Sequence, residues 1–287
     1  MTTGTRHALR LLISGPDRPG IISGVTGYLY RLGADVTSSD QYTSAPGPGT
    51  FFQRLAFTLP AAARGTLVST FGREVAEPFG LTWRLVDAAQ PKRVAILASK
   101  ADHCLVDLLW RMRRDELPMR VELVAANHPD LRATVEQHGI PFHHVPSVPG
   151  KPEESESRLA DLLGDRCDLI VLARYMQVLT GEFLTKVAVP LINIHHSVLP
   201  AFAGAQPYTR AYERGVKLIG ATAHYVTEEL DCGPIIEQDV ARASHRDDAA
   251  ALARLGADVE RTVLARAVRW HCEDRLLRHG NRVLVLS

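Results

Sequence analysis

Three polar residues in one turn-rich stretch of this sequence have the side chains needed for chemistry on a carbonyl group. They lie within residues 191–240, where Asn193 and His195 end an apolar run and Asp231 stands in a later turn. An amide can stabilise an oxyanion, an imidazole can move protons, and a carboxylate can tune the imidazole. The stretch therefore predicts a site for attack on a carbonyl carbon.

The spacing of Asn193 and His195 favours a shared role, although a lone histidine is more often structural. Residues two apart in extended backbone point to the same side, so these two can face one pocket while His196 points away. Adjacent histidines rarely bind one ion, and no carboxylate lies at a useful helical offset. We therefore expect no metal at this site.

The other polar residues of the stretch also have ordinary structural interpretations. Asp231 alone would be a turn residue before Cys232-Gly233-Pro234. His224 lies in an apolar run and is expected in the core or behind the catalytic side chains. Ser197, two residues after His195, is expected behind them as well.

The elements that position these residues change pattern near residue 90. The first part of the chain predicts the order βαββαβ, a ferredoxin-like unit. Its strands are expected at 9–14, 34–43, 51–57 and 81–85, with helices over 22–32 and 67–75. The polar, proline-containing stretch 88–92 predicts a linker between domains 1–87 and 93–287.

Beyond the linker, strands and helices alternate. Strands are expected at 94–98, 121–125, 168–172 and 189–193, with helices over 105–112 and 153–163, a long helix from 252 that Gly280 closes, and a last strand at 283–286. Repeated βα units predict an α/β fold with a Rossmann-like, mostly parallel sheet covered on both faces. Ligands bind beyond the carboxyl ends of such strands, where Asn193 and His195 lie.

Bulk composition excludes several classes of protein. The net charge is +1, which favours neither nucleic acid nor an anionic membrane. The four cysteines are far apart, so neither a disulfide framework nor a zinc knuckle is expected. No apolar run approaches the length of a membrane span, and the N-terminus lacks a secretory pattern. We expect a cytoplasmic protein.

Three motifs in order resemble the folate-dependent formyltransferase and formyl hydrolase family. They are NIHHSVLP at 193–200, GATAHYV at 220–226 and ELDCGPII at 229–236. The resemblance implies that Asn193, His195 and Asp231 form the catalytic set and that the C-terminal domain has the formyltransferase fold. It also implies a folate pocket formed by Tyr175, Met176, Gln177, Val178, Leu179, Thr227, Glu228 and Leu230.

Further features resemble the deformylase branch of this family. The transferases carry a glycine-rich phosphate loop after their first strand, whereas residues 97–104 contain no glycine and Asp102 would repel a phosphate. Lys100 can still bind an anion. His196 stands where transferases usually have proline, and the runs 195–197, 204–208 and 266–271 look like the deformylases. The sequence departs from that pattern at Val198, Thr209 and Cys232.

The N-terminal unit resembles an ACT domain, a regulatory module with the same βαββαβ order. Its loop from Gly15 to Gly20 stands at that family's loop position. The resemblance implies an amino-acid effector held near Asp17, Arg18, Gly20 and Ile21. The alternative is a packing or dimerisation unit. Because ACT domains usually pair, a homo-oligomer, either dimer or tetramer, is expected.

The resemblance implies hydrolysis of 10-formyltetrahydrofolate to tetrahydrofolate and formate, which would balance one-carbon pools for purine biosynthesis. The folate is then the substrate, and no permanently bound cofactor is expected. Two alternatives stay open: formyl transfer to an amine such as glycinamide ribonucleotide, and a non-catalytic folate-binding regulator. The sequence does not decide which group takes the first proton.

Overall fold

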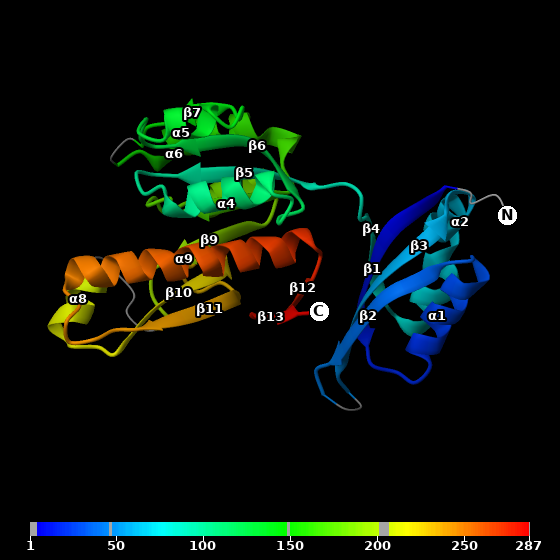
Figure 1. Ribbon diagram of the computed structural model, residues 1–287. Helices are drawn as coiled ribbons and strands as arrows, with labels where there is room; N and C mark the ends of the chain where they lie inside the picture. The colour runs from blue at the N-terminus through cyan, green and yellow to red at the C-terminus, as the bar shows by residue number, and fades with distance from the viewer. Residues whose placement is uncertain (1–4, 46–47, 148–149, 201–206, 287) are drawn as a thin grey trace. The chain divides into compact units, whose positions relative to one another are not determined.

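The structure is a computed structural model that describes residues 5–45, 48–147, 150–200 and 207–286 (Figure 1). None of the helices in these ranges combines the length and apolar character that crossing a bilayer requires. The α/β class expected from the sequence is confirmed.

The chain forms two compact units that do not follow its order strictly. Unit 1 comprises Met1–Gln90, Glu273–Leu277 and Val285–Ser287, and unit 2 comprises Pro91–Cys272 and Arg278–Leu284. The sequence predicted domains at 1–87 and 93–287 with a linker at 88–92, which assigns the whole C-terminal end to the second domain. The structure instead groups two short C-terminal segments with unit 1.

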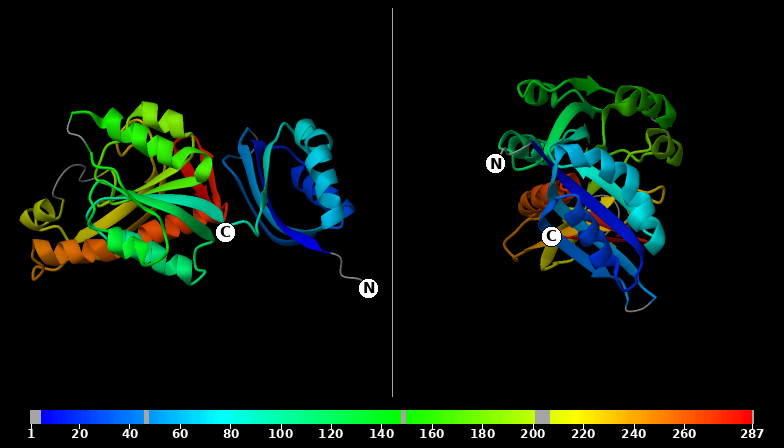
Figure 2. Two further views of the ribbon diagram at one scale, coloured as in Figure 1. Left: turned by 90° about the horizontal axis from the view of Figure 1, so that it is seen from above. Right: turned by 90° about the vertical axis from the view of Figure 1, so that its right-hand side faces the viewer.

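Unit 1 is a four-stranded antiparallel sheet in the order β2-β3-β1-β4 with helices on one face (Figure 2). Its elements are β1 (Arg6–Pro16), α1 (Ile21–Arg31), β2 (Asp35–Thr43), β3 (Thr50–Pro60), a 3-10 turn (Ala61–Ala63), α2 (Arg64–Phe71), a π turn (Gly72–Ala76), α3 (Glu77–Phe79) and β4 (Thr82–Asp87). This is the βαββαβ order predicted from the sequence. Alternate residues of β1, namely Leu9, Leu11 and Ile13, are buried in the core that includes the apolar side of α1.

Buried ion pairs explain why part of the C-terminal end belongs to unit 1. The Asp274 side chain is only 1% exposed and accepts from Arg10 at 3.1 Å and from Arg84 at 3.0 Å. Arg54 donates to the backbone carbonyl of Glu273 at 2.9 Å. These arginines come from β1, β3 and β4, so the segment after the last long helix is held by three strands of the N-terminal sheet. Long-range pairing of this kind leaves no local sequence signal.

Unit 2 contains a seven-stranded sheet in the order β11-β10-β9-β8-β5-β6-β7. The pairs from β9 to β7 are parallel, whereas β10 pairs antiparallel with both β9 and β11. Its elements are β5 (Lys92–Ala98), α4 (His103–Arg113), β6 (Met119–Ala126), α5 (Arg132–Glu136), β7 (Phe142–His144), α6 (Pro152–Leu163), a 3-10 turn (Gly164–Arg166), β8 (Leu169–Ala173), α7 (Gly181–Val187), β9 (Leu191–His195), α8 (Pro207–Glu213), β10 (Leu218–Tyr225), β11 (Ile235–Arg242) and α9 (Ala249–Cys272). A hairpin of β12 (Leu276–His279) and β13 (Arg282–Val285) follows.

Helices cover both faces of this sheet, as the continuous apolar strands require. All five residues of β8 are buried, which is typical of a central parallel strand. In Figure 2, α6 and α7 lie on one face and α4 and α9 on the other. The mostly parallel sheet is confirmed, and its carboxyl edge beside β8 and β9 is where the candidate residues lie.

Two expected element boundaries differ from the structure. The long helix ends at Cys272, and Gly280 instead lies in the turn between β12 and β13 with φ +59°. The prediction that Gly280 closes the helix is therefore wrong, because the ion-paired segment after Cys272 ends it earlier. β9 also extends to His195, so both candidate side chains belong to the strand.

Candidate active site

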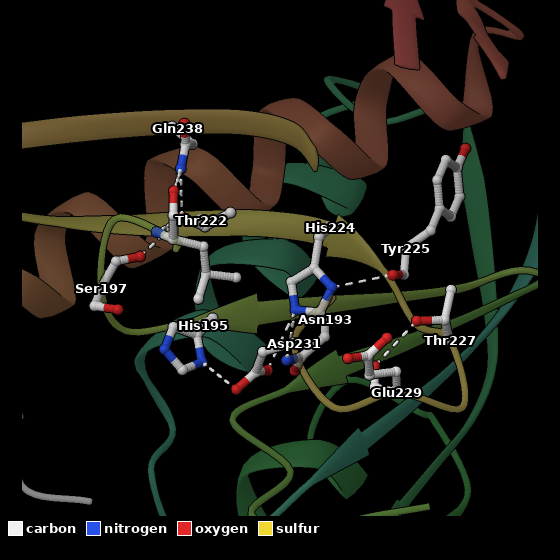
Figure 3. Close-up of polar contacts among 11 residues, drawn as sticks. Asn193, His195, Ser197, Thr222, His224, Tyr225, Thr227, Glu229, Asp231 and Gln238 are labelled. Carbon is white, nitrogen blue, oxygen red and sulfur yellow. Dashed lines mark hydrogen bonds and ion pairs between the residues drawn. The ribbon is translucent and has the colours of Figure 1, made fainter. Parts of the chain in front are cut away.

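The pairing of β9 with β10 brings Asn193 and His224 together. In the antiparallel register Asn193 stands opposite His224, and His195 stands opposite Thr222. Opposed residues of such a pair project to the same face. Asn193 Nδ2 accordingly lies 3.2 Å from His224 Nε2 (Figure 3).

The turn between β10 and β11 places Asp231 next to His195 and His224. Asp231 has φ +57°, a left-handed conformation that aspartate tolerates better than most residues. Gly233 packs so closely against β10 that a Cβ there would stand 1.8 Å from the carbonyl oxygen of Tyr225. Only glycine allows that approach, so the Asp-Cys-Gly-Pro sequence fixes the position of the carboxylate.

Asp231 bridges the two imidazoles. Its Oδ2 lies 3.2 Å from His195 Nδ1, and its Oδ1 lies 3.6 Å from His224 Nε2 (Figure 3). His195, which donates a hydrogen bond to it, and the neighbouring His224 hold the pKa of Asp231 well below its usual range. The carboxylate is therefore ionised at neutral pH.

His195 presents its second ring nitrogen to the site. The residue is 7% exposed, and within the described part of the chain its Nε2 has no hydrogen-bond partner. Because Nδ1 faces a carboxylate, which can only accept, Nδ1 carries the hydrogen in the neutral ring. The lone pair then lies on Nε2, the atom without a partner.

His224 fixes the orientation of the Asn193 amide. His224 Nδ1 lies 3.0 Å from the carbonyl oxygen of Tyr225 and donates to it. The Nε2 of the neutral ring then accepts one N–H of the Asn193 amide. The second N–H of that amide remains for a ligand, and His224 itself lines the same pocket.

Thr222 holds the chain that follows His195. Its hydroxyl donates to the backbone carbonyl of Ser197 at 2.8 Å and accepts from the N–H of Leu199 at 3.0 Å and from Gln238 at 2.9 Å (Figure 3). Thr222 is fully buried. Ser197 thus lies behind His195 and takes part in this network through its backbone, whereas Thr222 and Gln238 were missed by sequence reasoning.

A cavity of about 470 Å³ opens beside these groups. It brings together every residue predicted for the catalytic set and the folate pocket: Asn193, His195, Asp231, Tyr175, Met176, Gln177, Val178, Leu179, Thr227, Glu228 and Leu230. Met176, Val178 and Leu230 are each more than half exposed. Large apolar side chains left in solvent around a cavity mark a ligand site.

The prediction that His196 points away from the pocket is wrong. His196 lines the same cavity, and its ring stacks on that of His195 with centroids 5.2 Å apart. The strand ends at His195, so the alternation of side chains stops there. Burial, together with the charge of Arg174, lowers the pKa of His196 to about 4. The ring is therefore neutral at pH 7.

His103, Cys104 and Glu260 are the described group whose side chains come close enough to hold a metal ion. The two oxygens of Glu260 are already bonded, to His103 at 2.7 Å and to Tyr208 at 2.6 Å. Arg174 Nε lies 3.5 Å from the same carboxylate. A cation would face this guanidinium, and burial raises the pKa of the Cys104 thiol well above its usual value. The group fits a hydrogen-bonded cluster better than a metal site.

Comparison with known proteins assigns the family. Residues 92–268 match the formyl transferase family and residues 9–59 match the ACT domain. A formyltetrahydrofolate deformylase of Mycobacterium bovis is 58% identical over 96% of this chain and 90% of its own length. The chain belongs to the formyltetrahydrofolate deformylase family. The family resemblance stated from the motifs is thereby confirmed.

Solved structures agree with the assignment to the deformylase family. A formyltetrahydrofolate deformylase from Pseudomonas syringae superposes with a TM-score of 0.92 at 46% identity, covering 100% of this chain and 96% of that one. A glycinamide ribonucleotide transformylase from Symbiobacterium toebii gives a TM-score of 0.65 at 31% identity, covering 69% of this chain and 95% of that one. The deformylase likeness therefore spans the chain, whereas the transformylase likeness spans part of it.

The segment after β5, whose lack of glycine resembles the deformylases, supports the side of the cavity that carries Met176. Ser99 donates to Asn127 at 2.7 Å and accepts from the backbone N–H of Met176 at 3.1 Å. Asp102 is the N-cap of α4 and makes no side-chain cap bond. The segment thus positions the chain that carries Met176.

The departures from the deformylase pattern lie away from the cavity lining that the structure describes. Thr209 and Cys232 are both exposed, and neither is among the residues that line the cavity. Val198 lines a second, apolar cavity with Tyr208 and Gly220. Most of the run 204–208 lies outside the described residues.

Proposed function

We propose that this protein hydrolyses 10-formyltetrahydrofolate to tetrahydrofolate and formate. The observation that carries the proposal is the unpartnered Nε2 of His195 beside the Asn193 amide, in a cavity whose size suits one end of a folate. The names of the related deformylases support the same reaction. Asn193, His195 and Asp231 are the proposed catalytic residues.

The folate is proposed to enter along the chain from Tyr175 to Leu179 and to meet Thr227, Glu228 and Leu230 on the other side. All of these line the cavity, whose surface is largely apolar. A flat aromatic ring system buries apolar area there. The formyl group then reaches the polar end, where Asn193 and His195 lie.

In the first step, water attacks the formyl carbon. Nε2 of His195 takes a proton from the water while the new C–O bond forms. The carbonyl electron pair moves to oxygen, and the second N–H of Asn193 donates to this oxyanion. His195, rather than Asp231, is proposed as the base, because a carboxyl group with a strongly lowered pKa is a weak one.

In the second step, the tetrahedral intermediate collapses. The C–N bond breaks, and its electron pair takes the proton from the Nε2 of His195. Tetrahydrofolate and formate leave, with one proton released. Ionised Asp231 stabilises the imidazolium that exists between the two steps. His195 carries both proton transfers, with Asn193 and Asp231 stabilising the charges that form, so the proposed reaction needs no resident cofactor.

Purified protein should release formate from 10-formyltetrahydrofolate when no amine is present, because water is the proposed acceptor. Formate and tetrahydrofolate should appear in equal amounts when followed together. Adding glycinamide ribonucleotide should leave the rate unchanged. Product that appears only with the amine would instead indicate a formyltransferase, and folate binding without turnover would indicate a non-catalytic regulator.

The ACT unit is proposed to bind an amino acid at the start of α1. Gly20 caps this helix with φ +94°, and the first turn carries neither a side-chain cap nor an acidic residue. Free N–H groups at a helix start suit a carboxylate. Asp17, Arg18 and Ile21 flank the position and are the proposed contacts.

Titration of single amino acids into the full-length protein should detect the effector. Calorimetry should give heat of binding for at least one of them, and the same compound should change the rate of formate release. Absence of heat with all of them would favour a unit that serves packing or dimerisation alone.

The cellular setting proposed for the protein follows from the reaction. Hydrolysis of 10-formyltetrahydrofolate would return the folate and supply formate, balancing one-carbon pools for purine biosynthesis. We propose a cytoplasmic homo-oligomer, dimer or tetramer, because paired ACT units are the usual arrangement of that domain.

A further inference from the structure

A buried cluster lies beside the proposed catalytic histidine and takes no part in the two steps above. Its centre is Glu260 of α9, which is 1% exposed. Glu260 accepts from Tyr208 through Oε1, and its Oε2 lies 2.7 Å from His103 and 3.5 Å from Arg174. Burial favours the neutral acid, but His103, Arg174 and Tyr208 together outweigh it and lower the pKa of Glu260. The cluster is therefore built around an ionised carboxylate.

Gly256 gives Tyr208 its place in the cluster. A Cβ at Gly256 would stand 2.0 Å from the Tyr208 hydroxyl. Glycine inside a helix costs about 1 kcal/mol relative to alanine, and here it lets the phenol pack against α9 and reach Glu260 one turn later. The position of Tyr208 is thus set by close contact with the helix.

Arg174 links the cluster to the cavity. It directly follows β8 and has φ +62°, the left-handed conformation that glycine adopts most easily. Its side chain is 17% exposed and lines the cavity that also holds His195 and His196. Within the described residues, its Nη1 is buried and has no hydrogen-bond partner. Arginine is disfavoured in this backbone conformation, which glycine adopts easily. The Arg174 side chain fills space in the cavity that a glycine at this position would leave empty.

The arrangement leaves one side of the cavity for the nucleophile. The proposed folate residues lie at 175–179 and at 227, 228 and 230, and Asn193 is the proposed donor to the formyl oxygen. Among the other lining residues, His196 stacks on His195, and the charge of Arg174 acts on His196. An acceptor molecule larger than water would have to occupy the space that these two side chains fill.

We propose that Arg174, held by Glu260, closes the acceptor side of the active site and thereby commits the formyl group to water. The inference rests on the proposed hydrolysis and names the residue that makes the reaction hydrolytic. The guanidinium fills the volume an amine would need and repels the ammonium form of one. Glu260, bonded to His103 at the start of α4, places its negative charge next to this guanidinium and holds it in position.

The test measures how the formyl group divides between water and a small amine. Hydroxylamine, which is uncharged at neutral pH, serves as the probe, and formate and formohydroxamate are counted in the same reaction. In transfer, the C–N bond to the folate breaks, a C–N bond to hydroxylamine forms, and the proton lost by hydroxylamine goes to the folate nitrogen. Arg174→Gly should raise the ratio of hydroxamate to formate at least tenfold, since glycine suits the backbone at this position.

Arg174→Lys is the matched control, because lysine keeps the charge and most of the volume, and its ratio should stay near that of the unchanged protein. Arg174→Ser provides a second small side chain should the glycine variant fail to fold. An unchanged ratio in a folded small-residue variant that still releases formate would overturn the inference. If the unchanged protein released no formate at all, the proposed function itself would be wrong, which is a separate outcome.

Discussion

Asn193→Ala should lower kcat for formate release by about 100- to 1000-fold, the usual effect of removing one oxyanion donor. The Asn193 amide is held by His224 Nε2 at 3.2 Å, so its free N–H stands ready before substrate binds. A donor that is already oriented before the substrate binds stabilises the oxyanion of the transition state more than it stabilises the bound substrate. KM for 10-formyltetrahydrofolate should therefore change little, and single-turnover rates should fall with kcat.

Gln177→Ala is a suitable comparison for this experiment. It also removes an amide from the cavity lining, but on the side proposed to bind the folate ring. Its effect should fall on KM rather than on kcat. An Asn193→Ala variant that keeps kcat within a few fold of the unchanged protein would remove Asn193 from the catalytic set.

Local pattern predicted the parts of the site that lie on one strand or one turn. Asn193 and His195 end an apolar run, and Asp231 precedes Gly233-Pro234, so residue type and spacing placed the first two at a strand end and Asp231 in a turn. The partners of these residues were harder to find. The register that sets His224 opposite Asn193 depends on which strand β10 joins, and periodicity carries no such information.

The residues around Arg174 could not be predicted from local pattern. Glu260 lies in a long amphipathic helix and would ordinarily face solvent, yet it is buried against side chains from α4, α8 and the end of β8. Its burial depends on three partners far apart in the sequence. The one available signal was Gly256, since a glycine inside a helix usually marks a close contact.

Asp231→Asn should lower kcat on the order of 1000-fold or more, because an amide neither orients the His195 ring as the carboxylate does nor stabilises the imidazolium. Asparagine keeps the size of the side chain and tolerates the left-handed backbone at this position. The loss can therefore be assigned to the charge. Circular dichroism and folate binding should match those of the unchanged protein.

The pH profile of the same variant distinguishes the two candidate bases. Because hydrogen bonds hold the pKa of Asp231 well below its usual range, this carboxylate stays ionised through mildly acidic pH. A fall in kcat/KM on acidification of the unchanged protein should then come from protonation of an imidazole, and Asp231→Asn should keep that fall in its residual activity. A variant whose residual activity no longer falls with acid would instead identify Asp231 as the group that takes the proton from water.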